Sequence, residues 1–281
     1  LWATEKVMMR DRLRDYDPSL VPNFLVVHNA ESATVAKIEE KVGYPLIVKP
    51  SGLGASRLVS IVYHREELVS VLKKSFRRLN VVYKETAGRG EPTVMVEQFM
   101  EGSMYSIDVY VDAKGKGYFC PVVYIKTGKE IGFDDFFGYW QMSPTILKPA
   151  NEHMCQESAR KAVHALGLRS ITAHVELMRL ENGWKVIELG PRVGGFRQDL
   201  HQFTHGINHT MNDLLIRAGE KPLIPQKQLG YAIAMKFFAR KEGTLSKLTG
   251  LKKAQELASF KSISIEKKVG DKCLFAKNGG S

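Results

Sequence analysis

The chain has 281 residues, of which 44% are hydrophobic and 25% charged, so its composition is that of an ordinary globular protein with enough length for two lobes. No apolar run reaches the roughly 18 residues that a transmembrane helix needs. The 41 basic and 30 acidic residues give a formal net charge of +11, spread along the chain. This spread disfavours nucleic-acid binding and leaves a polyphosphate substrate or an acidic partner domain as explanations of the excess.

The cysteines and the start of the chain narrow the class of protein further. Cys120, Cys155 and Cys273 lie far apart and match no metal-ligand spacing, which indicates a reducing compartment and hence the cytoplasm. The chain begins at Leu1 without an initiator Met or a signal-peptide pattern, so we expect it to be a piece of a longer protein. The densest basic patch, at residues 73–78, falls on a predicted helix and is typical of a solvated face.

The N-terminal half is predicted to alternate short helices and strands. A helix capped by Thr4 comes first, and the strands on either side of a glycine-rich turn predict a hairpin. In chain order we expect a helix over 4–14, a strand over 24–27, a helix over 32–42, strands over 44–50 and 57–63, a helix over 66–79, and strands over 93–100 and 106–111.

The C-terminal half is predicted to contain two further helices and several strands. We expect a strand over 118–123, a helix over 151–166 closed by Gly167, paired strands over 170–179 and 184–189, a helix over 210–218, and tail strands over 231–239, 260–266 and 273–276. The aromatic segment 126–144 lacks periodicity and is either a pocket-lining loop or a loop packed on its own domain. This irregular alternation predicts an α+β fold with mixed sheets in two lobes.

A lysine and a glycine-rich loop form the first candidate site. Lys49 ends a predicted strand directly before the loop at 51–56, which contains Gly52 and Gly54. Glycines let backbone N–H groups approach phosphate oxygens, and a nearby ammonium group neutralises the phosphate charge. The segment is neither a P-loop nor a complete dinucleotide-binding motif. A hairpin turn that needs glycine is the alternative interpretation.

Two glutamates form the second candidate site. Glu176 and Glu188 lie on strands that the turn at 181–183 is expected to pair side by side. Two carboxylates that face one cleft repel each other unless a cation lies between them, and oxygen ligands suit Mg²⁺. The alternative is that one or both glutamates are solvent-facing strand residues.

The segment after Glu188 adds two arginines and two glycines. Arg192 precedes Gly194 and Gly195, and an arginine near a metal and a phosphate stabilises the charge of a transferring phosphoryl group. Arg197 follows the glycines and is suited to hold a substrate carboxylate bidentately. The alternatives are a turn arginine that faces solvent and an ordinary surface arginine.

The strand over 94–102 suggests a purine contact. Glu97 would accept a hydrogen bond from the adenine amino group, while the backbone near Phe99 and Met100 would pair with the ring edge. By itself the segment is not specific, and an ordinary core strand is the favoured interpretation.

Three histidines repeat every four residues, as metal ligands on a helix would. His201, His205 and His209 have this spacing, but Gly206 interrupts a helix there. A structural or substrate-adjacent role is therefore favoured over a metal site.

In this order and at this spacing, the segments resemble the ATP-grasp superfamily over nearly the whole chain. The motifs that carry the resemblance are Thr-Glu-Lys-Val-Met-Met-Arg at 4–10, Pro-Leu-Ile-Val-Lys-Pro at 45–50, Val-Glu-Gln-Phe-Met-Glu-Gly at 96–102 and Glu-Leu-Gly-Pro-Arg-Val-Gly-Gly at 188–195. The resemblance implies two α/β lobes that clasp ATP and a β-rich C-terminal end, similar to the carboxylase-like and amino-acid-ligase-like branches. We expect residues 1–97 to form the N-terminal part and residues 98–281 the C-terminal lobe.

The resemblance also implies a role for each site residue. Glu176 and Glu188 would hold one or two Mg²⁺ ions, for which Mn²⁺ can substitute. Lys49 and Arg192 would be the catalytic residues. ATP would be bound by Lys6, Lys49, Ser51, Gly52, Gly54, Ser56, Glu97, Gln98, Phe99 and Met100. The substrate would contact Arg192, Gly194, Gly195 and Arg197.

Three positions depart from the family pattern. Gly190 stands where many relatives have a metal-binding asparagine, although some amino-acid ligases also have glycine there. Met104 stands where many relatives have an acid that binds ribose, which leaves that contact to Asp108 or to water. Phe196 stands where biotin carboxylases have a catalytic glutamate, so bicarbonate activation is disfavoured.

The function that the resemblance implies is ATP-dependent ligation of a carboxylate to an amine through an acyl phosphate, with small-molecule substrates of the amino-acid or dipeptide type. The alternatives are an ATP-grasp enzyme of purine or carbamoyl metabolism and a non-catalytic nucleotide-binding regulatory module. We expect no membrane partner and an additional N-terminal domain in the full-length protein. A homodimer is compatible with the sequence.

Overall fold

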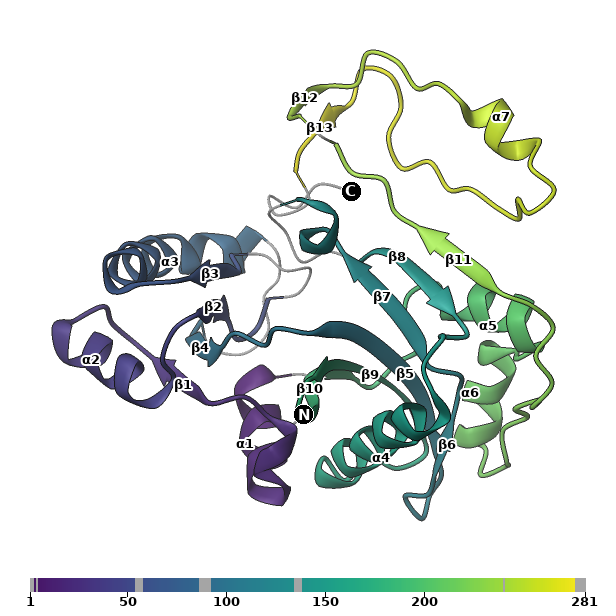
Figure 1. Ribbon diagram of the computed structural model, residues 1–281, viewed down its shortest axis with the longest axis horizontal. Coiled ribbons are helices and arrows are strands. Elements are labelled where there is room, and N and C mark those ends of the chain that lie inside the picture. The colour runs from purple at the N-terminus through teal and green to yellow at the C-terminus, as the bar shows by residue number, and fades with distance from the viewer. Residues whose placement is uncertain are drawn as a thin grey trace.

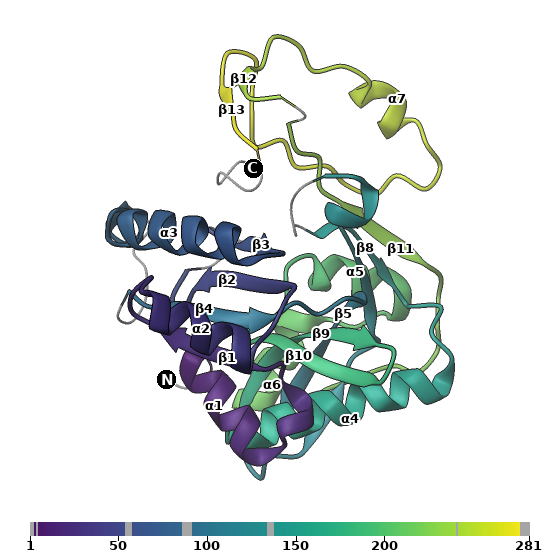
Figure 2. The same ribbon diagram turned by 60° about the vertical axis from the view of Figure 1, so that its left-hand side comes forward.

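Two separate sheets divide the protein into a smaller and a larger lobe, as Figures 1 and 2 show. The computed structural model describes residues 3, 5–53, 58–85, 92–133, 138–239 and 241–275. The smaller sheet has four strands in the order β1-β4-β2-β3, and the larger has seven strands, six of them in the order β10-β9-β5-β7-β8-β11 with β6 paired to β5. The predicted α+β class is confirmed.

The smaller lobe packs two helices against an antiparallel sheet. Its elements are β1 (Phe24–Val27), α2 (Ser32–Lys41), β2 (Leu46–Pro50), β3 (Ser60–Val62), α3 (Arg65–Glu85) and β4 (Val94–Gln98). The predicted hairpin is confirmed, because β2 and β3 pair antiparallel. Helix α3 runs beyond its predicted end because Leu79, Val82 and Tyr83 continue the buried stripe.

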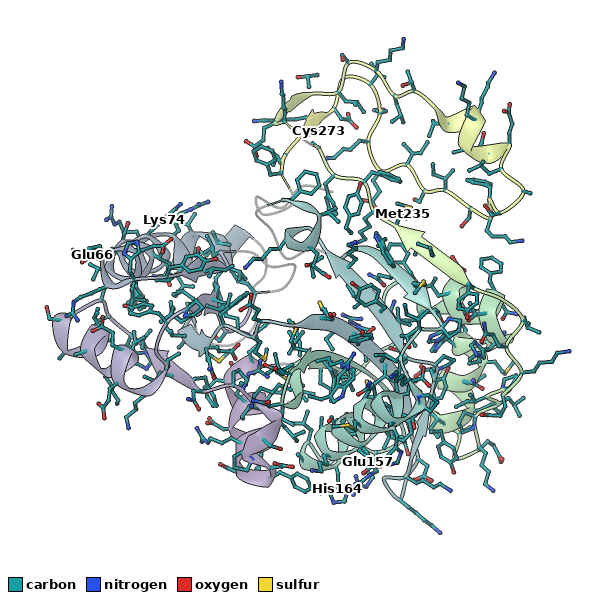
Figure 3. The ribbon with its side chains drawn as sticks, in the orientation of Figure 1. Glu66, Lys74, Glu157, His164, Met235 and Cys273 are labelled. Atoms are coloured by element: carbon teal, nitrogen blue, oxygen red, sulfur yellow. The ribbon has the colours of Figure 1, made fainter. Side chains whose placement is uncertain are left out.

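The basic face of α3 has the environment expected of a solvated surface. Lys73, Lys74, Arg77 and Arg78 are exposed. Figure 3 shows Lys74 and Glu66 at the outer surface of this helix.

The larger lobe is built on the long antiparallel strands β5 and β9. Its strands are β5 (Ser103–Val111), β6 (Gly117–Phe119), β7 (Val123–Thr127), β8 (Gly138–Ser143), β9 (Ile171–Leu180), β10 (Gly183–Gly190) and β11 (Ala232–Met235). Helix α4 (Pro149–Ala165) buries Ala159 and Ala162 against them and ends, as predicted, near Gly167.

Helix α1 (Lys6–Tyr16) belongs to the core of the larger lobe. Its Met9 and Leu13 are 1% and 0% exposed and pack with the interior residues of β5, β9, β10 and α4. The N-cap is Glu5, whose carboxylate accepts from the backbone N–H groups of Val7 and Met8. The predicted cap, Thr4, lies outside the described residues. The short turn η2 (Pro18–Leu20) follows α1.

Two helices follow β10, and the sequence predicted only the second. Helix α5 (Arg197–His205) begins directly after the double glycine and ends at Gly206, whose φ is +70°. Helix α6 (His209–Arg217) is capped by Asn208 and stops near Gly219, as predicted. Gly206 therefore ends α5, and the histidine repeat spans two helices.

Other parts of the larger lobe differ from the prediction. The single strand predicted over 118–123 is two strands, β6 and β7. The segment 126–144 contains the turn η3 (Lys129–Ile131) and β8, which pairs with both β7 and β11. Its irregular pattern follows from burial, since five of the six β8 residues are only half-buried.

The tail beyond β11 has little regular structure among the described residues. It contains β12 (Gly243–Thr244), α7 (Leu251–Gln255) and β13 (Lys272–Cys273). The strand predicted over 260–266 is wrong, because its alternating Ile263 and Ile265 are 45% and 51% exposed and cover no core. The strand predicted over 273–276 overlaps β13 only at Cys273, and residue 276 lies outside the described residues. Figure 3 places Cys273 in this tail and Met235 at the end of β11.

Candidate functional site

Two carboxylates lie opposite each other on neighbouring strands of the larger sheet. Glu176 of β9 and Glu188 of β10 are cross-strand partners, so their side chains extend on the same face of the sheet. The side chains are 28% and 46% exposed, and neither is closed off from solvent. An irregularity between Val186 and Glu188 sets this register. The hairpin of β9 and β10 therefore places the two glutamates side by side, as predicted.

Lys6 connects the glutamate pair with the glycine-rich loop of the smaller lobe. Its Nζ lies 3.5 Å from Glu188 Oε1 and donates a hydrogen bond of 2.9 Å to the backbone carbonyl of Leu53. Only 16% of the side chain is exposed. The helix on which Lys6 lies is packed on the larger lobe, so this ammonium group is held at the boundary between the lobes.

A second lysine, Lys49, forms an ion pair at the same boundary between the lobes. Lys49 Nζ lies 2.5 Å from Glu97 Oε2, and Arg10 Nε donates to Glu97 Oε1 at 2.5 Å. Arg10 also donates to the carbonyls of Val186 and Ile187 on β10. Arg10 carries no signal of its own in the sequence, because a buried arginine on a helix stripe has no distinctive spacing.

The charges in this cluster shift the pKa values of its members. Burial of Glu97 favours its neutral form, but the charges of Arg10 and Lys49 outweigh burial and lower its pKa to about 2. Burial lowers the pKa of Lys49, which the negative charge of Glu97 opposes. The lysine is therefore held in place by its carboxylate partner.

Glu97 is not placed as the sequence analysis expected. Its Oε1 accepts from Arg10 and its Oε2 lies against Lys49, so both oxygens already have a cationic partner. We revise its role to that of a group that positions Lys49. The strand around Glu97 also has the packing of an ordinary core strand, since Val94, Met95 and Val96 are all fully buried.

The linker after β4 lies at the edge of the smaller lobe. Gln98 is exposed, and its N–H donates to the carbonyl of Asn23. The Phe99 N–H donates to the carbonyl of Pro45, and Lys129 Nζ lies 4.2 Å from the centroid of the Phe99 ring. Phe99 and Met100 are half-buried, which is compatible with a flat ligand beside them.

The start of the glycine-rich loop is anchored within the smaller lobe. Ser51 is buried, with its hydroxyl 2.6 Å from Thr93 Oγ1, and the Gly52 N–H donates to Tyr83 Oη at 2.7 Å. These two residues therefore fix the base of the loop. Gly54 and Ser56 lie outside the described residues.

The double-glycine turn joins the glutamate strand to α5. Arg192 is exposed, and its guanidinium donates to the carbonyl of Val193. Gly194 N–H donates to Asp108 Oδ2, and a Cβ on Gly194 would lie 2.4 Å from His174 Nδ1. Gly195 has open space around its Cα. Only glycine therefore fits at 194.

Arg197 is a buried residue and not a surface arginine. It is 1% exposed, and its guanidinium donates to Gln141, to the carbonyl of Gly195 and to the Ser106 hydroxyl. Burial lowers its pKa, which the charges of Asp108 and Glu176 oppose. Both terminal nitrogens of the guanidinium are used in contacts with β5, β8 and the turn, so a bidentate contact with a substrate carboxylate is not preformed.

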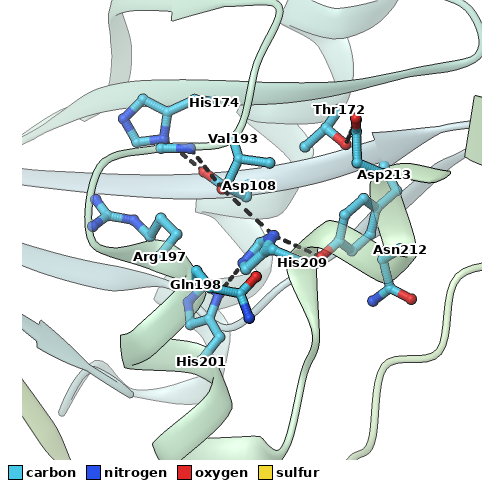
Figure 4. Close-up of polar contacts among 12 residues, drawn as sticks. Asp108, Thr172, His174, Val193, Arg197, Gln198, His201, His209, Asn212 and Asp213 are labelled. Atoms are coloured by element: carbon cyan, nitrogen blue, oxygen red, sulfur yellow. Dashed lines mark hydrogen bonds and ion pairs between the residues drawn. The ribbon is translucent and has the colours of Figure 1, made fainter.

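A buried acid, Asp108, and a buried histidine, His174, lie next to each other in the larger lobe, as Figure 4 shows. His174 Nδ1 lies 2.6 Å from Asp108 Oδ1, and His174 Nε2 lies 3.3 Å from Glu176 Oε1. Burial opposes a charge on His174, but Asp108 and Glu176 raise its pKa above the ordinary value. Asp108 is fully buried, so of the two alternatives for the ribose contact, Asp108 and water, the structure favours water.

The chemistry of these groups fits a nucleotide and a hard metal ion. Glu176 and Glu188 supply solvent-accessible oxygen ligands of the kind that Mg²⁺ takes. Lys6 and Lys49 supply positive charge for phosphate oxygens. A family model described as the ATP-grasp domain matches residues 42–199, which is more than half of the chain.

The chain belongs to the ATP-grasp family.

The ATP-grasp match agrees with similarity to a ligase. The chain is 26% identical over 158 residues to the D-alanine--D-alanine ligase of Fervidobacterium nodosum, a match that covers 56% of this chain and 45% of the ligase. The chain thus spans less than half the length of that relative.

Solved structures share the ATP-grasp fold. The L-amino acid ligase from Bacillus licheniformis superposes with a TM-score of 0.75 at 24% identity, covering 97% of this chain and 63% of that one. The biotin carboxylase domain of the Hydrogenobacter thermophilus 2-oxoglutarate carboxylase, in complex with MgADP, superposes with a TM-score of 0.65 at 18% identity, covering 83% and 49%. No helix within the described ranges is long and apolar enough to cross a membrane.

Proposed function

We propose that this ATP-grasp chain binds ATP between its lobes and catalyses the ligation of a carboxylate to an amine. The observation that carries the proposal is the Glu176–Glu188 pair, with Lys6 held between Glu188 and the glycine-rich loop. A triphosphate in contact with Lys6 would lie beside both carboxylates, which is where a phosphate-bound divalent ion needs its protein ligands.

The proposed reaction has two steps. The terminal phosphoryl group of ATP passes to a carboxylate oxygen of the acid, which gives ADP and an acyl phosphate. The amine then attacks the acyl carbon, phosphate leaves, and the amine loses a proton. Positioning and charge neutralisation supply most of the catalysis in such a reaction.

Each proposed site residue has a distinct part in this reaction. Lys6 and Lys49 bind the phosphates, and Glu176 and Glu188 hold Mg²⁺, which neutralises phosphate charge when bound. Exposed Arg192 contacts the transferred phosphoryl group. Glu97 and Arg10 position Lys49, while buried Arg197 positions the Gly194–Gly195 turn.

We further propose substrates of the amino-acid or dipeptide type. The relatives named for amino-acid ligation support this class. Phe196, exposed at the start of α5, has no carboxyl group with which to act on bicarbonate, which argues against a carboxylase. The presence of Glu176, Glu188, Arg192 and Lys49 together argues against a regulatory module, because loss of catalysis usually removes the metal ligands.

The test is to incubate the protein with MgATP and single or paired amino acids and to measure ADP, phosphate and the mass of the product. We expect ADP and phosphate in equal amounts only when acid and amine are both present. The Glu176→Gln, Glu188→Gln variant should lose at least about 100-fold in turnover, because it removes the charge that holds the metal.

The outcomes separate the proposal from its rivals. Hydroxylamine added in place of the amine should trap an acyl phosphate as a hydroxamate. Nucleotide binding without ADP release, in the full-length protein and across the amino-acid pairs, would support the regulatory module instead. ADP release that depends on bicarbonate would support a carboxylase.

A further inference from the structure

A second group of potential metal ligands lies inside the larger lobe, away from the glutamate pair. Cys120, His201 and His209 each present a ligand atom, and these atoms lie within 4.8 Å of one another. The three residues are 1%, 0% and 1% exposed. Figure 4 shows the two histidines beneath the strand that carries Asp108.

The three ligands come from three different elements. Cys120 directly follows β6, and its backbone N–H donates to the carbonyl of Asp108 on β5. His201 lies on α5, and His209 is the first residue of α6. A cation held here would fasten both helices to the hairpin of β5 and β6.

The spacing is close to that of a tetrahedral zinc site. Zn–N and Zn–S bonds at tetrahedral angles place ligand atoms about 3.3 to 3.6 Å apart. The rings of His201 and His209 are stacked with centroids 5.0 Å apart, and His201 Nδ1 lies 2.7 Å from His209 Nε2. Small ring movements therefore suffice to admit a metal ion.

The surroundings support this chemistry. His209 Nδ1 lies 2.7 Å from Tyr110 Oη, so a proton on Nδ1 would leave Nε2 with its lone pair. His201 Nε2 is buried and has no hydrogen-bond partner among the described residues, so this nitrogen is available to carry the ring proton when Nδ1 binds a metal ion.

We propose that Cys120, His201 and His209 form a buried site for Zn²⁺, separate from the Mg²⁺ site of the ligase reaction. Two imidazole nitrogens and one thiolate are a ligand set that zinc prefers. On binding, the Cys120 thiol releases its proton and forms a Zn–S bond. The proton shared by the two rings moves to His201 Nε2, and the imidazoles remain neutral. Because all three ligands are buried, we expect the ion to stabilise the fold, with its fourth tetrahedral position filled by a group other than these three residues.

The site would act on the ligase through the turn before α5. Helix α5 begins at Arg197, whose guanidinium donates to the carbonyl of Gly195. A metal ion that fixes α5 through His201 therefore also fixes the Gly194–Gly195 turn beside the proposed Mg²⁺ site.

The test uses Co²⁺ as a spectroscopic probe for Zn²⁺. The protein is stripped with a chelator and titrated with CoCl₂, and the near-ultraviolet thiolate-to-cobalt absorption is recorded. We expect one equivalent per chain and displacement of the band by ZnCl₂. Zn²⁺ should also raise the Tm of the stripped protein. Mg²⁺-type binding at Glu176 and Glu188 gives no thiolate band, so failure here is distinct from failure of the ligase proposal.

Matched variants assign the band. The chain has three cysteines, so a variant with Cys155→Ser and Cys273→Ser keeps Cys120 alone and should retain the band. Cys120→Ser should abolish it. If that variant does not fold, His201→Gln should lose the band while His205→Gln keeps it. A stripped wild-type protein that shows no band with Co²⁺, or a band that survives Cys120→Ser, would overturn the proposal and leave the cluster as a hydrogen-bonded one only.

Discussion

At the scale of single residues, the most informative side chain is Glu97. It is 3% exposed and lies between two cations, Arg10 and Lys49. Removing one member of a buried charge group strands the others without a counter-charge, which costs more than the group contributes as a whole. We therefore expect Glu97 to contribute both to the stability of the fold and to the position of Lys49.

Replacing Glu97 with glutamine should produce a pH-dependent loss of stability. We expect Glu97→Gln to lower the free energy of unfolding at neutral pH by about 3 to 5 kcal/mol. The folded pKa of about 2 lies below the ordinary 4.5, so the wild-type advantage is fully present above pH 4.5 and is lost as the pH falls toward 2. Urea unfolding from neutral pH down to about pH 3 measures this. A difference between the two proteins that stays constant with pH would contradict the assignment.

Lys6 offers a prediction about nucleotide binding. If it contacts phosphate, Lys6→Met should raise the KM for ATP by about 10- to 100-fold, the equivalent of one charge-assisted contact. Lys161→Met is the matched control, because Lys161 pairs with Asp17 at a distance from the site. Steady-state kinetics on both variants decides the matter, and equal KM values would remove Lys6 from the phosphate site.

At the scale of elements, the turn between β10 and α5 depends on one glycine. A Cβ at Gly194 would meet His174 Nδ1 at 2.4 Å and Arg197 Cγ at 2.8 Å, whereas one at Gly195 would meet nothing within 4 Å. Both neighbours of Gly194 are buried and hydrogen-bonded, so they cannot move aside at low cost.

The two glycines therefore form a matched pair of variants. Gly194→Ala should destabilise the protein by about 1 to 3 kcal/mol, as overpacking of an interior does. It should also lower turnover, because the turn carries the proposed substrate contacts. Gly195→Ala should change the free energy of unfolding by less than about 0.5 kcal/mol. Thermal melts of the two proteins measure the contrast, and similar losses in both would show that the turn can adjust.

Elements with a strong local sequence pattern were predicted well, and elements that depend on distant contacts were not. Strands with a strong local pattern, such as β1 and the β9–β10 hairpin, were predicted almost to the residue, and the hairpin in turn predicted that Glu176 and Glu188 would face each other. Helix α5 was missed because Gly206 was taken to interrupt a helix that it terminates. The roles of Glu97 and Arg10 could not be read from the sequence, since their pairing spans 87 positions and depends on how the sheets meet.

At the scale of the whole molecule, Arg10 connects the two sheets. It is fully buried, donates to Glu97 on the smaller sheet, and donates to the carbonyls of Val186 and Ile187 on the larger one. Arg10 has no distinctive sequence signal of its own, yet its guanidinium on α1 donates hydrogen bonds to acceptors in both lobes.

Replacing Arg10 should weaken the union of the lobes. We expect Arg10→Met to cost about 3 to 5 kcal/mol because it leaves buried acceptors unpaired. The double variant Arg10→Met, Glu97→Met should lose clearly less than the sum of the two single losses, since the partners depend on each other. Denaturant unfolding of the four proteins completes the cycle, and strict additivity would mean that the pair does not act as a unit.

The two proposed phosphate-binding lysines belong to different lobes of the protein. Lys6 lies on a helix that is embedded in the core of the larger lobe, whereas Lys49 lies on a strand of the smaller sheet. A swing of one lobe against the other must therefore stretch or shorten the gap between the two ammonium groups, while Lys6 keeps its distance from Glu188. Binding of the nucleotide and closure of the lobes would then be coupled, because the polyphosphate contacts a lysine on each lobe.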